Sequence, residues 1–154
     1  MKNCELMEVF LIKALERFYE RDQYLIENKA HERSCVFRIA HYLNNMLEAN
    51  PAVKKWGVDV EYNRLPLTAS TTNGRNKKSL RIVRPDLIVH IRDTNKYNLL
   101  VAEFKCSWNR FTKKQIEKDI NTLNGLVNGD CEYKRGVLIK LTDDKPEIIK
   151  RIIK

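Results

Sequence analysis

The sequence predicts one α/β domain in which a mixed β-sheet carries helices on both faces. Two adjacent runs, 82–91 and 98–106, have strand length and are apolar on both faces, which is typical of central strands covered on both sides. Two amphipathic segments precede these runs, and a helix followed by another strand comes after them. The expected order is therefore α-α-β-β-β-α-β-α, and 154 residues suffice for a single domain.

The first third of the chain predicts two helices and a strand. Residues 5–27 read as a long amphipathic helix, and 30–48 read as a second helix that Asn50-Pro51 ends. Alternation of apolar and polar residues over 58–62 predicts a half-exposed strand. Residues 65–80 are polar and predict a long loop.

The second half begins with the two central strands, which the polar turn 93–96 joins. A helix is expected over 113–127, and Thr112 with Gln115 supplies a capping box at its start. A buried strand at 135–141 and a short helix at 145–153 complete the predicted domain.

Charge is unevenly distributed along the chain. The net charge is +9, but residues 1–63 sum to −1 and residues 64–154 to +10. From Arg64 to Arg84, both included, there are six basic residues and no acid. This distribution favours a polyanion-binding face, although a basic surface without a partner would give the same count.

Composition and cysteine spacing exclude several classes of protein. Hydrophobic residues make up 43% and charged residues 32%, which argues against disorder and against a collagen-like chain. No apolar run reaches the length of a membrane span, and no signal peptide is recognised, so a cytoplasmic protein is expected. The four cysteines have no C-x-x-C spacing, which predicts free thiols and no structural zinc.

Three ionisable residues interrupt the apolar strands. Asp86 stands at the start of the first strand, and Glu103 and Lys105 stand at the end of the second. Alternation places Glu103 and Lys105 on one face together with Val101. Buried charges are costly unless they are paired or bind a metal, so these residues are the first candidates for a functional site.

The turn between the strands predicts how they pair. A hairpin that pivots between Thr94 and Asn95 places Asp86 directly opposite Glu103, with Cβ atoms about 4.5–5.5 Å apart. A divalent cation between the two carboxylates would turn their repulsion into attraction. On the helix at 30–48, Glu32 shares the core-facing stripe and could bring a third carboxylate.

Pro85-Asp86, followed after 16 residues by Glu103-Phe104-Lys105, resembles the motif of the PD-(D/E)xK nuclease superfamily. The resemblance implies a restriction-endonuclease-like core, α-β-β-β-α-β, over residues 30–141. Residues 1–29 would then be an N-terminal helical addition and 142–154 a C-terminal extension of a single nuclease-like domain. The RecB-like subgroup of this superfamily adds Gln-x-x-x-Tyr on the next helix. In this sequence the residue four positions after Gln115 is Asp119 and not tyrosine, so the chain departs from the pattern of that subgroup.

The resemblance also implies a role for each residue. Asp86 and Glu103, with the backbone carbonyl of Phe104, would bind Mg²⁺ or Mn²⁺, and Glu32 would complete the metal shell or bind a second ion. Lys105 would orient the attacking water and stabilise charge on the phosphate. The expected nucleic-acid contacts are Arg75, Lys77, Lys78, Arg84, Arg110, Lys113 and Lys114.

Structural roles are the alternative for several of these residues. Asp86 could pair with Lys105 and Glu103 with Arg84 in buried salt bridges, and Glu32 could simply favour its helix N-terminus. Gln115 is expected to be a cap, and His90 and Trp108 are expected to be structural. Arg110, Lys113 and Lys114 could equally form an ordinary solvated helix start. Trp108 and Phe111 lie among these basic residues and could stack on nucleic acid, although packed aromatics are the commoner case.

The predicted function is a metal-dependent nuclease that hydrolyses phosphodiester bonds, with DNA favoured over RNA and endonuclease over exonuclease action. A nucleic-acid-binding module that keeps the fold without catalysis is one alternative. Another is an interaction subunit that uses the amphipathic helix at 5–27, which could also serve as the face of a homodimer.

Overall fold

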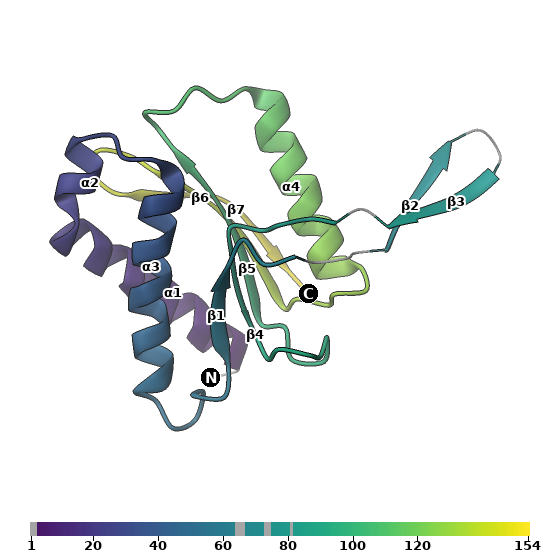
Figure 1. Cartoon of the computed structure of the whole chain (residues 1–154), viewed down its shortest axis with the longest axis horizontal. Helices are drawn as coiled ribbons and strands as arrows, with labels where there is room; N and C mark the ends of the chain where they lie inside the picture. Colours follow the sequence, from purple (N-terminus) through teal and green to yellow (C-terminus); the bar gives the residue numbers. More distant parts are fainter. Residues whose placement is uncertain (1–2, 64–66, 73–74, 81) are drawn as a thin grey trace.

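The structure is a computed structural model that describes residues 3–63, 67–72, 75–80 and 82–154; for 67–72 and 75–80 it describes the backbone alone. It is an α/β fold with a mixed five-stranded sheet and helices on both faces, as the sequence predicts (Figure 1). The elements are α1 (Asn3–Arg21), α2 (Gln23–Glu27), α3 (Glu32–Glu48), β1 (Gly57–Val60), β2 (Leu67–Thr72), β3 (Arg75–Leu80), β4 (Leu87–His90), β5 (Leu100–Cys106), α4 (Lys113–Asn128), β6 (Arg135–Leu141) and β7 (Pro146–Ile153).

The sheet has the strand order β1-β4-β5-β6-β7. Strand β4 is antiparallel to β1 and to β5, β5 and β6 are parallel, and β7 is antiparallel to β6. Parallel neighbours need a crossover connection, and α4 supplies it between β5 and β6. The sheet therefore has α1 and α3 on one face and α4 on the other (Figure 1).

The N-terminal amphipathic segment forms two helices, whereas the sequence predicts one over 5–27. The break falls at Asp22, whose carboxyl accepts hydrogen bonds from Arg38 Nε at 2.9 Å and from the Tyr42 hydroxyl at 2.6 Å. These contacts fix the end of α1 against α3. The helix at 30–48 is confirmed as α3, and the one at 113–127 as α4.

The loop predicted for 65–80 is wrong. Strands β2 and β3 pair as an antiparallel hairpin, from Leu67 opposite Leu80 to Thr72 opposite Arg75. The hairpin projects from the body of the molecule near α4 (Figure 1). The sequence does contain a signal for it, because Asn73-Gly74 is a typical pair between two hairpin strands.

The first central strand is shorter than predicted. Strand β4 begins at Leu87 rather than at residue 82. Pro85 has no N–H to donate and restricts the residue before it, which explains why regular pairing starts after this position. The other predicted strands are confirmed as β1, β5 and β6, although β1 ends at Val60, before the left-handed Glu61 (φ 49°).

The C-terminal helix predicted for 145–153 is also wrong, because these residues form strand β7. The isoleucines at 148 and 152 are four residues apart, which suits a helix, but β6 would be an open edge without β7. Pairing satisfies the backbone groups along β6, and β-branched side chains suit a strand. A bulge at Leu138/Ile139 shifts the register of the pair.

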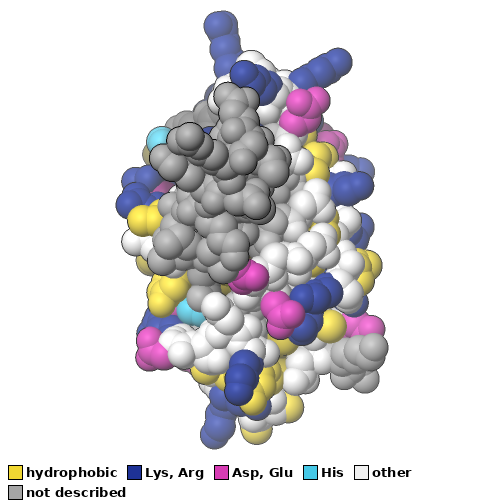
Figure 2. Space-filling model, turned by 90° about the vertical axis from the view of Figure 1, so that its right-hand side faces the viewer, with side chains coloured by type: hydrophobic (Ala, Val, Ile, Leu, Met, Phe, Trp, Pro, Cys, Tyr) yellow, Lys and Arg dark blue, Asp and Glu magenta, His cyan; other side chains and the backbone are white. Residues whose placement is uncertain are grey.

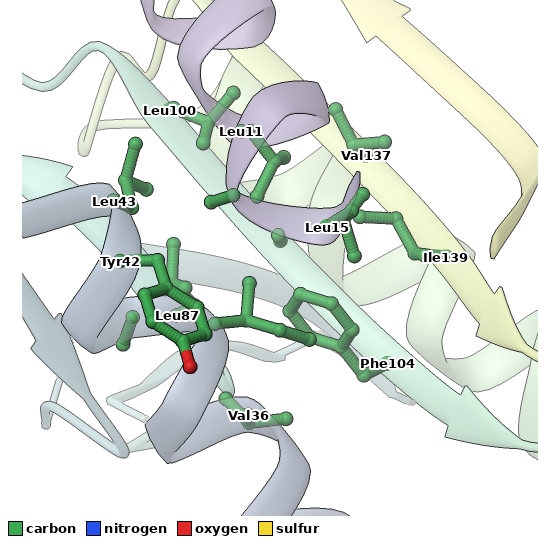
Figure 3. Packing of buried hydrophobic residues seen from close by; sticks show 14 of the residues in the cluster. Leu11, Leu15, Val36, Tyr42, Leu43, Leu87, Leu100, Phe104, Val137 and Ile139 are labelled. Carbon is green, nitrogen blue, oxygen red and sulfur yellow. The ribbon is translucent and has the colours of Figure 1, made fainter. Parts of the chain in front are cut away.

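Two apolar cores lie on the two faces of the sheet. The larger core joins α1 and α3 to alternate residues of the central strands, and Figure 3 shows Leu11, Leu15 and Leu43 around Phe104 and Leu100. The smaller core joins Leu123 and Val127 of α4 to Val101 and Leu138. The apolar face of α1 is thus covered within the chain.

All four cysteines are free, as predicted. Among the described residues, no helix combines the length and apolarity needed to cross a bilayer.

Candidate functional site

The predicted pairing of the two central strands is confirmed. Leu87 pairs with Ala102 and Ile88 with Val101, and the same register continued by one residue places Asp86 opposite Glu103. The backbone N–H of Phe104 donates a hydrogen bond of 2.7 Å to Asp86 Oδ2. Asp86 is therefore tied to the strand that carries Glu103, just where β4 begins.

Glu103 is an almost fully buried acid, with 8% of its surface exposed. Burial raises its pKa to about 10, and the adjacent Asp86 contributes through its charge and a hydrogen bond. Burial also raises the pKa of Asp86, although the Phe104 N–H opposes the shift. In the absence of a cation, the two carboxyl groups therefore retain a proton between them at neutral pH.

Lys105 lies on the same face as Glu103 but does not form the predicted alternative salt bridge with Asp86. Its Nζ lies 2.8 Å from Asp119 Oδ2 on α4, and it donates a hydrogen bond of 3.0 Å to the carbonyl of Phe104. The ion pair is close, but its angles are not those of a hydrogen bond. Burial tends to lower the pKa of Lys105; the charges of Asp119, Glu32 and Asp86 outweigh this effect and raise it.

Glu32 reaches the site from the first turn of α3. Its Oε2 accepts a hydrogen bond of 3.0 Å from the backbone N–H of Cys106, at the end of β5. Burial raises the pKa of Glu32, and the charge of Lys105 opposes this. The predicted inward orientation of Glu32 is thus correct, and His31, which precedes it, caps the helix by accepting from the Arg33 N–H.

Two openings lead to these side chains from opposite sides. A groove of ≈ 620 Å³ runs between α4 and residues 82–84 and includes Glu103 and Asp119. A smaller cavity of ≈ 160 Å³ includes Glu32, Asp86 and Glu61. Glu103 therefore borders one opening, and Glu32 and Asp86 border the other.

The donor atoms suit a hard cation. Carboxyl oxygens of Asp86 and Glu103 and the carbonyl of Phe104 are the ligands that Mg²⁺ prefers, and Mg²⁺ needs only one or two carboxylates because it keeps several waters. Within the described residues, no three His, Cys, Asp or Glu side chains already form a metal-binding group. The expectation of a metal site therefore rests on the chemistry of these donor atoms. Glu32 lines the same cavity as Asp86 and could add a further carboxylate.

The predicted nucleic-acid contacts have different environments. Arg84 Nε donates a hydrogen bond of 2.7 Å to Asn63 Oδ1 and not to Glu103, so the second alternative salt bridge is also absent. Arg84 and Lys114 both border the groove. Arg110 and Lys113 are exposed and lie within four residues of Lys114 in the sequence. The side chains of Arg75, Lys77 and Lys78 lie outside the described residues. Figure 2 shows both basic and acidic side chains among the described residues of the face that it draws.

Three residues have the structural roles that the sequence predicts. The Gln115 side chain accepts from the Thr112 N–H at 2.7 Å and completes the capping box. Trp108 Nε1 donates to the carbonyl of Ala30 at 2.9 Å. His90 is buried, with its Nε2 2.7 Å from Asp59 Oδ2.

Sequence reasoning missed Asp119 as a site residue. It lies on α4 four residues after Gln115, where the RecB-like pattern has tyrosine, and its carboxylate meets Lys105. The inward face of α4 offered a signal, because Asp119 shares it with Ile116 and Leu123. A polar residue on that stripe needs a partner.

No protein-family model matches the chain, and no curated protein matches it. A solved structure described as "Crystal structure of SSO0001" is similar over 96% of this chain and 76% of that chain, with 18% sequence identity and a TM-score of 0.40. A similarity of this extent identifies neither a family nor an activity.

Proposed function

We propose that the protein is a metal-dependent nuclease that hydrolyses phosphodiester bonds, in DNA in preference to RNA. One observation supports this above all: Asp86 and Glu103 meet across two central strands, with Lys105 two residues further along the same face. Two adjacent buried acids weaken a fold, and acids with strongly raised pKa values are common at functional sites. Their presence here therefore favours a functional role. The mixed sheet with helices on both faces is compatible with the restriction-endonuclease-like core.

In this proposal, Asp86, Glu103 and the Phe104 carbonyl hold Mg²⁺ or Mn²⁺. A bound ion of this kind polarises a phosphoryl oxygen and lowers the pKa of water. Lys105 presents positive charge to the phosphate and orients the attacking water. Glu32 accepts from the Cys106 N–H at the end of β5, and its negative charge would complete the metal shell or bind a second ion.

The test is a panel of plasmid, linear, single-stranded and branched DNA and RNA, each with and without Mg²⁺ or Mn²⁺. We expect metal-dependent cleavage that falls to a small residual rate in Glu103→Ala and Lys105→Ala while binding persists. The matched control is Asp130→Ala, which removes an exposed acid beyond α4. Unchanged cleavage in the two site variants would refute the assignment of the site.

A non-catalytic nucleic-acid-binding module is the second candidate, and the Lys105–Asp119 ion pair favours it, because the carboxylate offsets the positive charge that Lys105 would present to a phosphate. The module predicts salt-sensitive binding that needs no metal, and no cleavage of any substrate in the panel. Homodimerisation is also a proposal, and the solution mass of the protein tests it.

A further inference from the structure

Helix α4 carries two features that concern the proposed reaction. Its exposed side borders the groove that leads to Glu103, and its inward side carries Asp119, the partner of Lys105. Helix α4 lines the groove with two lysines, Lys114 and Lys118, two neutral polar residues, Asn121 and Thr122, and two acids, Glu117 and Asp119. One rigid element therefore contacts both the groove and the lysine.

The place of Asp119 on α4 is fixed from both directions. The capping box of Thr112 and Gln115 sets the start of the helix about two turns earlier. One turn later, Leu123 is fully buried in the smaller core. Asp119 is itself mostly buried, with 17% of its side chain exposed.

Lys105 needs such a partner if it is to act on a phosphate. A lysine side chain has four flexible methylene groups and three donors, so it has no preferred direction of its own. In the structure, the Lys105 ammonium group contacts the Asp119 carboxylate and the Phe104 carbonyl, and these two contacts hold it beside the strand that carries Glu103.

We propose that Asp119 is a positioning residue that holds the Lys105 ammonium at the end of the α4 groove, where a bound phosphodiester chain meets the acids. This inference rests on the proposed nuclease function and adds to it the element that aligns the lysine with the substrate. The groove residues of α4 bind the chain: Lys114 and Lys118 contact phosphates, and Asn121 and Thr122 hydrogen-bond to the sugar or bases.

The experiment is a double-mutant cycle on cleavage with Mg²⁺, using an oligonucleotide that the wild-type protein cuts. We expect Asp119→Ala to lower kcat by about 10- to 100-fold with KM within about twofold, since positioning affects the reaction more than binding. Asp119→Asn keeps an oxygen acceptor and should be intermediate, and Asp119→Glu should recover part of the loss. Asp130→Ala removes the same charge without contacting Lys105 and should leave kcat unchanged.

The cycle is completed in a Lys105→Ala background, with enzyme in excess over substrate and long incubation so that a low residual rate can be measured. If Asp119 acts through Lys105, Asp119→Ala costs less than about threefold there, because the interaction is already lost. An equal loss in both backgrounds, or no loss in the wild-type background, would overturn the inference while the nuclease function stands. A wild-type protein that cuts nothing in any metal would refute the nuclease function, and the inference with it.

Discussion

The backbone N–H of Phe104 donates a 2.7 Å hydrogen bond to Asp86 Oδ2, so the carboxyl that precedes β4 is anchored on β5 by the main chain. Its partner Glu103 lies one residue away from that N–H and is nearly fully buried. Two acids are thus held together by the sheet itself, whatever their protonation. The consequences of this arrangement are measurable without any assay of activity.

The first prediction concerns pH and stability in the metal-free protein. Glu103 has its pKa raised to about 10, so its contribution to stability is fully present below the ordinary value of 4.5 and is lost as the pH rises toward 10. Glu103→Gln imitates the protonated acid and should unfold at a higher temperature than wild type at pH 8, by about 2–4 °C for each kcal/mol regained. Thermal unfolding with EDTA between pH 5 and 9 measures this; parallel curves for the two proteins would contradict it.

A second prediction concerns cation binding. Because burial raises the pKa of both Asp86 and Glu103, a divalent cation must displace a proton and should stabilise the protein more at pH 8 than at pH 6. At a hundredfold excess over Kd the gain is about 2.7 kcal/mol. Thermal shifts with Mg²⁺ or Mn²⁺ test this, and Asp86→Asn should abolish them while Asp130→Asn keeps them. A shift that survives in Asp86→Asn would place the cation elsewhere.

Glu32 allows charge and hydrogen bonding to be separated. Glu32→Gln keeps an acceptor for the Cys106 N–H, so its stability should match wild type, while metal-dependent cleavage falls by about 10- to 100-fold. Glu32→Ala leaves that N–H without its acceptor and should lower the free energy of unfolding by roughly 1–3 kcal/mol, as expected for a buried donor that loses its partner. Urea unfolding and cleavage rates measure the two effects. Full activity in Glu32→Gln would mean that Glu32 is only structural.

The groove along α4 predicts a specific salt dependence of DNA binding. Lys114→Ala with Lys118→Ala removes two cations that border the groove. We expect weaker binding and a slope of log K against log salt that is shallower by up to about 2. Lys13→Ala with Lys54→Ala removes the same charge from exposed positions elsewhere and serves as the control. Equal effects of the two pairs would show that only net charge matters.

Substitution by alanine should change the stability of the protein in opposite directions at Gly125, within α4, and at Gly129, which follows the helix. A Cβ at Gly129 would meet the carbonyl oxygen of Gly125, which belongs to the backbone and cannot easily move. We expect Gly129→Ala to lower the free energy of unfolding by about 1–3 kcal/mol. A Cβ at Gly125 meets nothing, so Gly125→Ala should stabilise the helix by about 0.4–1 kcal/mol. Urea unfolding compares them, and a loss of stability in Gly125→Ala would contradict the geometry.

The sequence by itself determined the elements whose signals are local or periodic. The capping box of α4, the apolar runs of β4 and β5, and the register that sets Asp86 opposite Glu103 all follow from short-range patterns and one tight turn. The inward direction of Glu32 follows in the same way from helical periodicity.

The tertiary structure decided what depends on distant partners. Residues 146–153 become a strand because β6 offers an open edge, and the first helix ends at Asp22 because Arg38 and Tyr42 of α3 hold its carboxyl. Asp119 meets Lys105 only because the crossover helix lies over the ends of the central strands. Contacts between residues far apart in the chain depend on how whole helices and strands pack, and short-range sequence patterns do not specify that packing.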